Sequence, residues 1–156
     1  MNKKIWLAGV LAAAFIGSAG SSAIAEEEKS PEALRQEQAA KSCLSVEGDV
    51  KKRIDSCTYL IDNSDKLILK NEAAKPQYMA IFHYNRAANY LESQSLSEAL
   101  DDLNKAIEFN PDYATAYYMR GDLHMRLKNK QQAKQDFKKA AELEPDNPTY
   151  QKAAKG

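Results

Sequence analysis

The sequence predicts an all-α fold, an α-solenoid of about three stacked helix pairs, and three observations support this class. Residues 80–113 recur without a gap as residues 114–147, with ten of 34 positions identical. Apolar residues within each copy follow the three- and four-residue spacing of a helix face. Each copy ends near a proline, Pro111 or Pro145, which disfavours helix at the residue before it. Repeats of this kind stack, because one helix pair cannot bury both of its faces.

Residues 1–25 differ in composition from the rest of the chain. Lys3 and Lys4 precede an almost wholly apolar run at 5–16, and an Ala-Ile-Ala sequence ends at Ala25 before three glutamates. This order is typical of a cleaved secretory signal peptide. The apolar run is shorter than the roughly 20 residues of a membrane span, although an uncleaved anchor remains an alternative. The sequence therefore predicts an exported protein, periplasmic or secreted, that is cleaved after Ala25.

The charge of the mature chain excludes several classes of partner. Cleavage would leave 131 of the 156 residues, and loss of Lys3 and Lys4 would leave 20 basic against 22 acidic side chains. Charges of both signs are mixed along the chain, without a basic block. We therefore expect neither nucleic-acid binding nor membrane association after signal cleavage.

Residues 26–79 are predicted to form a degenerate helix pair followed by a loop. Ser30 and Pro31 are typical of a helix start, and a second helix is expected over 50–62. The first helix has a weak apolar face of Ala33, Leu34, Ala39, Ala40 and Leu44. Residues 63–77 are too long for a turn between repeats, so we expect a loop there, with a short helical or buried piece at 66–75. This pair would supply the third layer of the stack.

The two regular repeats are each predicted to contain two antiparallel helices. Their first helices carry stripes of His83, Ala87, Tyr90 and Leu91, and of Tyr117, Gly121, His124 and Met125. The spacing of Ser95 and Glu98 fits a capping box at the start of a second helix. Residues 148–156 form a C-terminal tail, expected to be a short, fraying helix that caps the stack incompletely.

These residues resemble the tetratricopeptide-repeat (TPR) family, whose repeat unit has the same length. The places that define the repeat hold Ala87, Tyr90, Ala99, Leu103, Ala106 and Pro111 in one copy, and Tyr117, Gly121, Ala133, Phe137, Ala140 and Pro145 in the other. His83 and His124 depart from the family pattern, being polar where an aromatic residue is usual. We expect both histidines to be packed structural residues.

The resemblance implies a non-catalytic module that binds a protein or peptide on a concave groove. The groove residues carried over from the family are Ile81, Tyr84, Ala88, Leu91, Thr115, Tyr118, Asp122 and Met125. Packing against a neighbouring helix is the alternative role for these residues. The family's clamp for acidic C-terminal peptides uses basic residues and asparagine at comparable places, and this sequence does not support it. No motif indicates an enzyme, a metal site or a cofactor.

Two cysteines, Cys43 and Cys57, lie in the predicted first helix pair. An antiparallel pair with its turn between them would bring them close, and exported proteins commonly form disulfides. A structural disulfide is the main interpretation, and a redox or metal-binding thiol is the alternative. A further alternative function is self-association, as a homo-oligomer, through the C-terminal face after Tyr150.

Overall fold

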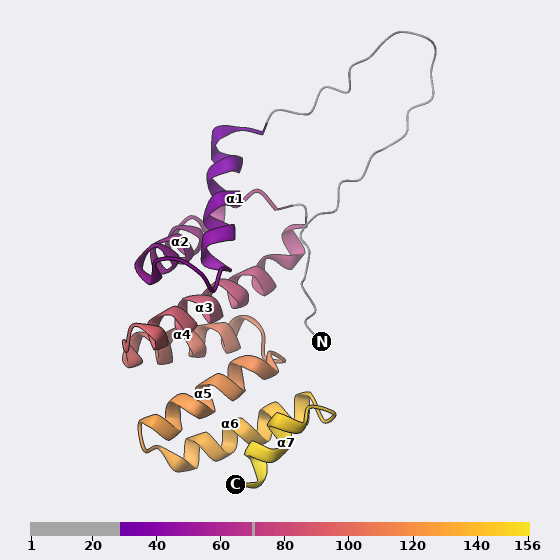
Figure 1. Cartoon of the computed structure of the whole chain (residues 1–156). Helices are drawn as coiled ribbons and strands as arrows, with labels where there is room; N and C mark the ends of the chain where they lie inside the picture. Colours follow the sequence, from indigo (N-terminus) through magenta and orange to yellow (C-terminus); the bar gives the residue numbers. More distant parts are fainter. Residues whose placement is uncertain (1–28, 70) are drawn as a thin grey trace.

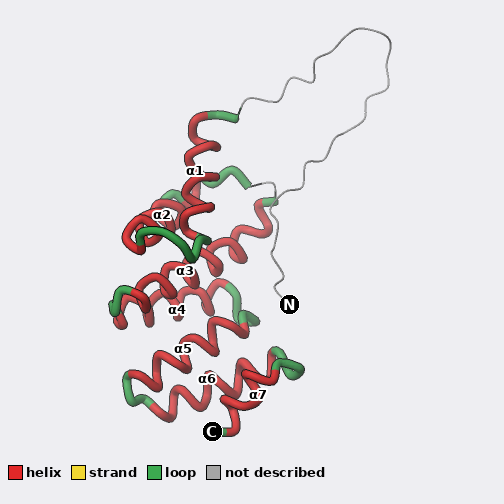
Figure 2. Tube along the Cα trace, viewed as in Figure 1, coloured by secondary structure: helices red, strands yellow, loops and turns green. Residues whose placement is uncertain are grey.

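The computed structural model describes residues 29–69 and 71–156, so the predicted signal peptide lies outside the described residues. The helices are α1 (Pro31–Cys43), α2 (Val50–Asp62), α3 (Lys75–Glu92), α4 (Leu96–Phe109), α5 (Ala114–Arg126), α6 (Lys130–Leu143) and α7 (Pro148–Lys155). Two 3-10 turns, Ser64–Lys66 and Glu72–Ala74, lie between α2 and α3. The pairs α1–α2, α3–α4 and α5–α6 are stacked in chain order, with α7 at the end (Figure 1). The described part contains no strand (Figure 2). The predicted all-α solenoid is therefore confirmed.

Helix α1 begins as predicted, but the residues that it buries differ in part from the predicted apolar face. The Ser30 hydroxyl accepts a hydrogen bond from the Ala33 amide at 3.2 Å. Leu34 and Leu44, expected on the buried face, are 46% and 37% exposed, whereas Gln36 is only 7% exposed. The predicted face is therefore wrong at Leu34 and Leu44, whereas Ala39 and Ala40 pack against the core around Cys43 and Cys57 as expected. Gln36 is buried because a chain segment after α2 supplies its polar partners.

Gln36 fastens this segment to α1. Its side-chain oxygen accepts from the Ile68 amide at 2.9 Å, and its side-chain nitrogen donates to the Lys66 carbonyl at 3.0 Å. Leu67, between them, is 8% exposed and joins the core around Cys43 and Cys57. Residues 66–68 of the long connection are thus anchored to the first layer.

Helix α3 begins earlier than the repeat alignment predicts. Its first residue is Lys75, five residues before Ala80, and Pro76 lies in its first turn rather than in the preceding loop. Proline is favoured there because the first amides of a helix have no intrahelical acceptor, so its missing N–H is not needed. The boundary between the first helix pair and the first regular repeat therefore falls in the connection between Asp62 and Lys75.

The turns within the two regular repeats have the same backbone geometry. Gln94 and Lys128, one repeat apart, have φ angles of 63° and 62°. The following amides reach back to the preceding helix, Ser95 N to Tyr90 O and Asn129 N to His124 O, both at 2.8 Å. This pattern is a helix C-cap closed by a left-handed residue.

The predicted capping box at Ser95 is wrong. Ser95 is the N-cap of α4, but its side chain accepts no hydrogen bond from the helix amides. Its hydroxyl oxygen instead accepts from the Ser93 hydroxyl at 3.3 Å. The turn before α4 therefore competes with the helix for this side chain.

Most of the repeat-defining residues lie in the core. Seven of them are buried: Ala87, Ala99, Leu103, Ala106, Gly121, Ala133 and Ala140. Tyr90, Tyr117 and Phe137 are half-buried, and Pro111 and Pro145 are exposed in the turns. At Gly121 an added Cβ would lie 2.7 Å from Cε1 of Phe137, so the close approach of α5 to α6 requires glycine.

The C-terminal tail forms helix α7 and covers part of α6. The Asn147 side chain accepts from the Thr149 amide at 3.1 Å and caps the helix. Tyr150 is 7% exposed, and its hydroxyl donates to the Thr115 hydroxyl of α5 at 3.2 Å. The expected short C-terminal helix is therefore present, and one buried tyrosine anchors it to α5 and α6.

Candidate partner-binding face

Each regular repeat is held together by a buried, two-pronged ion pair. Arg86 on α3 donates to Asp102 on α4, from Nε to Oδ2 at 2.7 Å and from Nη2 to Oδ1 at 2.8 Å. Arg120 on α5 donates to Asp136 on α6 in the same way, at 2.9 and 2.7 Å. Both the arginine and the aspartate are identical between the two copies, but the repeat pattern did not assign them a role.

The same two arginines connect each repeat to the layer before it. Nη1 of Arg86 donates to the Thr58 hydroxyl on α2 at 3.0 Å, and Nη1 of Arg120 donates to the Asn104 side chain on α4 at 2.8 Å. Thr58 and Asn104 are 46 residues apart, 12 more than the repeat length, which matches the long connection after α2. Helix α2 is therefore the second helix of a first, degenerate unit.

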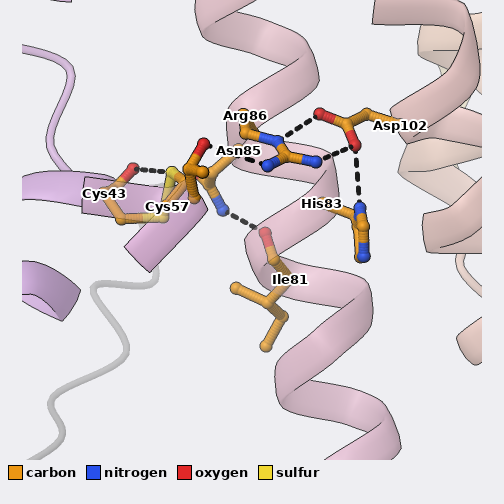
Figure 3. The surroundings of a disulfide bond; sticks show 8 residues. Cys43, Cys57, Ile81, His83, Asn85, Arg86 and Asp102 are labelled. Atoms are coloured by element: carbon orange, nitrogen blue, oxygen red, sulfur yellow. Dashed lines mark hydrogen bonds and ion pairs between the residues drawn. A yellow bond between two sulfur atoms is a disulfide. The ribbon is translucent and has the colours of Figure 1, made fainter. Parts of the chain in front are cut away.

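In this first unit a disulfide lies where the regular repeats have other contacts. With the 46-residue offset, Ser56 lies at the position equivalent to Asp102, so the first unit has no carboxylate at this position. Cys57 lies at the position equivalent to Leu103. Cys57 is bonded to Cys43, with Cα atoms 4.8 Å apart and both residues 0% exposed (Figure 3). A bonded, fully buried sulfur offers no thiolate for metal binding or exchange.

The two histidines lie beside the ion-pair carboxylates. His83 Nδ1 is 2.8 Å from Asp102 Oδ1 and carries the proton that the carboxylate accepts (Figure 3). Its ring stacks on Phe109 at 5.6 Å. His124 Nε2 is 3.9 Å from Asp136 Oδ2. Both histidines are thus packed against a core carboxylate, as structural residues.

Burial and hydrogen bonding shift the pKa of the Asp102 carboxyl in opposite directions. Burial alone would raise the pKa of its carboxyl, but the hydrogen bonds from Arg86 and His83 outweigh burial and leave the pKa below its ordinary value. Asp102 is therefore held as a carboxylate.

The groove residues predicted from the family lie on α3 and α5, but not all of them are free. Ile81, Ala88 and Leu91 are half-buried on α3, and Met125 on α5 is 48% exposed. Asp122 pairs with Arg126, one turn further along α5, at 3.0 Å. The tyrosines and Thr115 are instead engaged with other parts of the chain.

Tyr84 and Tyr118 each pack against aromatic rings from other elements. The Tyr84 ring lies 5.1 Å from that of Tyr113, just before α5. The Tyr118 ring lies between Phe137 at 5.5 Å and Tyr150 at 5.0 Å. The residues that sequence reasoning missed are Tyr113 and Tyr150, because their aromatic character alone does not reveal where a turn and a tail place them.

The described residues contain no cluster of potential metal ligands. No group of three or more histidine, cysteine, aspartate or glutamate side chains in 29–69 and 71–156 could hold a metal ion. Of the helices described, none is both long and apolar enough to cross a membrane. A hollow of about 610 Å³, lined by Tyr118, Pro148, Thr149, Lys152 and Ala153, lies beside α7.

A stack of antiparallel helix pairs with closely similar units defines a helical-repeat protein. Family models match two segments, described as "TPR repeat" over residues 87–128 and as "Tetratricopeptide repeat" over residues 114–147. The chain therefore contains tetratricopeptide repeats over residues 87–147.

Solved structures of several TPR domains are similar to this chain. The second TPR domain of human RPAP3, in complex with an HSP70 peptide, is 27% identical, with a TM-score of 0.60, covering 80% of this chain and 92% of that one. The TPR domain of Arabidopsis OM64 is 26% identical, with a TM-score of 0.57, covering 79% and 88%. A TPR domain of Spaghetti bound to an HSP90 peptide, at 24% identity and a TM-score of 0.61, supports the fold alone.

Among curated proteins, the human mitochondrial import receptor subunit TOM70 is 38% identical over 53 residues. That match covers 34% of this chain and only 9% of the receptor. The similarity therefore concerns the repeats and not the whole receptor.

Proposed function

We propose that this protein is a non-catalytic binding module that holds an extended segment of a partner protein against α3 and α5. The observation that carries the proposal is the cluster of tyrosines at this face, with half-buried apolar residues beside it. Tyrosine combines apolar area with a polar tip and is enriched at interfaces. Similar TPR domains have been solved with HSP70 and HSP90 peptides, which supports a peptide as the kind of partner.

We further propose that the protein acts outside the cytoplasm. The signal-like composition of residues 1–25 supports export, and an oxidising compartment would maintain the Cys43–Cys57 disulfide. N-terminal sequencing of the protein from its native host should begin at Glu26. A chain that begins at Met1 would contradict the proposal.

Self-association through the C-terminal face is the weaker proposal. Tyr150, which precedes the face expected to self-associate, is buried against α5 and α6. The described chain thus leaves less apolar surface at this end than the sequence suggested.

Site-specific photocrosslinking tests the binding face. A photoreactive amino acid at Ala88 on α3 should capture a partner in living cells, and the same amino acid at Lys134, exposed on the outer face of α6, should not. Capture from Lys134 alone, or equally from both places, would place the interface elsewhere.

A further inference from the structure

Three tyrosine side chains from different elements gather at the C-terminal end of the proposed groove. Tyr84 comes from α3, Tyr113 from the turn before α5, and Tyr150 from α7. The rings of Tyr84 and Tyr113 are 5.1 Å apart, and the Tyr150 hydroxyl reaches Thr115 on α5. Tyr118 packs on Tyr150 at 5.0 Å, and Tyr150 is near enough to Tyr84 and Tyr113 to raise the pKa of each.

The hydroxyls of Tyr84 and Tyr113 have no hydrogen-bond partner within residues 29–69 and 71–156. Both rings are half-buried. Burial first, and then nearby phenols, raise the pKa of Tyr84 and of Tyr113. No cation near either hydroxyl lowers its pKa. The cluster therefore presents neutral O–H donors that lack an acceptor from the chain itself.

We propose that these hydroxyls bind neutral acceptors, the backbone carbonyl groups of an extended peptide, rather than a terminal carboxylate. This inference rests on the proposed function and specifies the chemistry of its ligand. A half-buried carboxylate without a cation would lose more hydration than neutral phenols return, whereas a neutral carbonyl loses less hydration when it accepts a hydrogen bond from the same phenols. Recognition at this end of the groove is then independent of the peptide's terminus.

Lys152 is the cation that would bind a terminal carboxylate if the peptide's C-terminus were recognised instead. It lines the hollow beside Tyr118 and is exposed. A free-acid peptide whose terminus enters that hollow would depend on this lysine. Substitution of Lys152 therefore separates carboxylate recognition from carbonyl recognition.

The test uses dodecapeptides selected on the protein from a random phage library and synthesised with either a free-acid or an amidated C-terminus. Tyr84→Phe and Tyr113→Phe remove only the hydroxyls. Tyr59→Phe is the matched control, because its hydroxyl donates to Glu32 at the other end of the stack. Dissociation constants are measured by calorimetry, and melting temperatures verify that each variant is folded.

We expect each of Tyr84→Phe and Tyr113→Phe to weaken binding about fivefold, and Tyr59→Phe and Lys152→Ala to leave it within twofold. The two forms of each peptide should bind equally. Unchanged affinity in both cluster variants, or a preference for the free acid that Lys152→Ala abolishes, would overturn the inference while leaving peptide binding intact. Failure to select any peptide would overturn the proposed function as well.

Discussion

Arg86 holds Asp102 by two parallel hydrogen bonds across the α3–α4 pair, and one repeat later Arg120 holds Asp136 in the same geometry. The carboxylates are almost completely buried, with side chains 5% and 7% exposed. Since each arginine also reaches the layer before its own, one side chain fixes both the pairing within a repeat and the stacking between repeats.

Removing one partner of this ion pair should destabilise the protein strongly. Arg86→Met leaves the Asp102 carboxylate buried with only His83 as a donor, and we expect a loss of about 3 kcal/mol in the free energy of unfolding. Urea denaturation monitored by circular dichroism measures it. Arg126→Met, which removes the exposed pair with Asp122, is the control and should cost less than about 1 kcal/mol. Similar losses in both variants would refute a special role for the buried pair.

Acid should weaken the fold through Asp102. Its pKa is below the ordinary value in the folded protein, so the unfolded chain binds the proton more readily. The stability that results is present above about pH 4, the ordinary pKa of aspartate, and is lost as the pH falls through the lower, folded value. Melting temperatures between pH 5 and 2 should therefore decline less steeply in Asp102→Asn than in the wild type. The exposed neighbour variant Asp101→Asn should follow the wild-type curve.

The disulfide should stabilise the first helix pair more than the last. Replacing both Cys43 and Cys57 by alanine releases a loop with a sequence separation of 14, worth about 3 kcal/mol in the chain-entropy model. Hydrogen exchange should show faster exchange in α1 and α2, with α5 and α6 little changed. A reductant should alter the wild type and leave the double variant unaffected. A uniform loss of protection would mean that the stack unfolds as one unit.

Asn89→Leu should stabilise the protein. Asn89 is 3% exposed, and its side-chain nitrogen has no hydrogen-bond partner within the described residues. The equivalent place one repeat later holds the fully buried Leu123. Relieving one unsatisfied buried donor is worth about 1 kcal/mol, visible as a higher denaturation midpoint. A lower midpoint would indicate that Asn89 has a partner that the leucine removes.

Glycine should be favourable at the left-handed turn residue. Gln94 has a φ of 63°, a region that costs a residue with a Cβ about 1 kcal/mol, so Gln94→Gly should raise the melting temperature. Ser93→Gly, at a φ of −83°, is the control: it adds flexibility to the unfolded chain and removes the hydroxyl that donates to Tyr90 and Ser95, so it should lower the melting temperature. Equal effects at the two positions would contradict a conformational cause.

Sequence reasoning located the helices better than it located the contacts that matter for the site. The ungapped repeat predicted the two regular helix pairs and the small residues between them, such as Gly121 against Phe137. It identified Tyr84 and Tyr118 as recurring residues of the groove. It did not predict that Tyr113 and Tyr150 join them, because these contacts depend on where a turn and a short terminal helix are placed in space.

By itself the sequence determined the class of fold, because helix periodicity, turn residues and repeat spacing act over a few residues and leave a regular trace. The tertiary structure decided which polar groups meet: Gln36 with the connection after α2, Arg86 with Asp102, and Tyr150 with Thr115. Such partners lie 16 to 35 residues apart. No sequence periodicity identifies which donor will meet which acceptor, because only the packing of the helices brings each pair within hydrogen-bond distance.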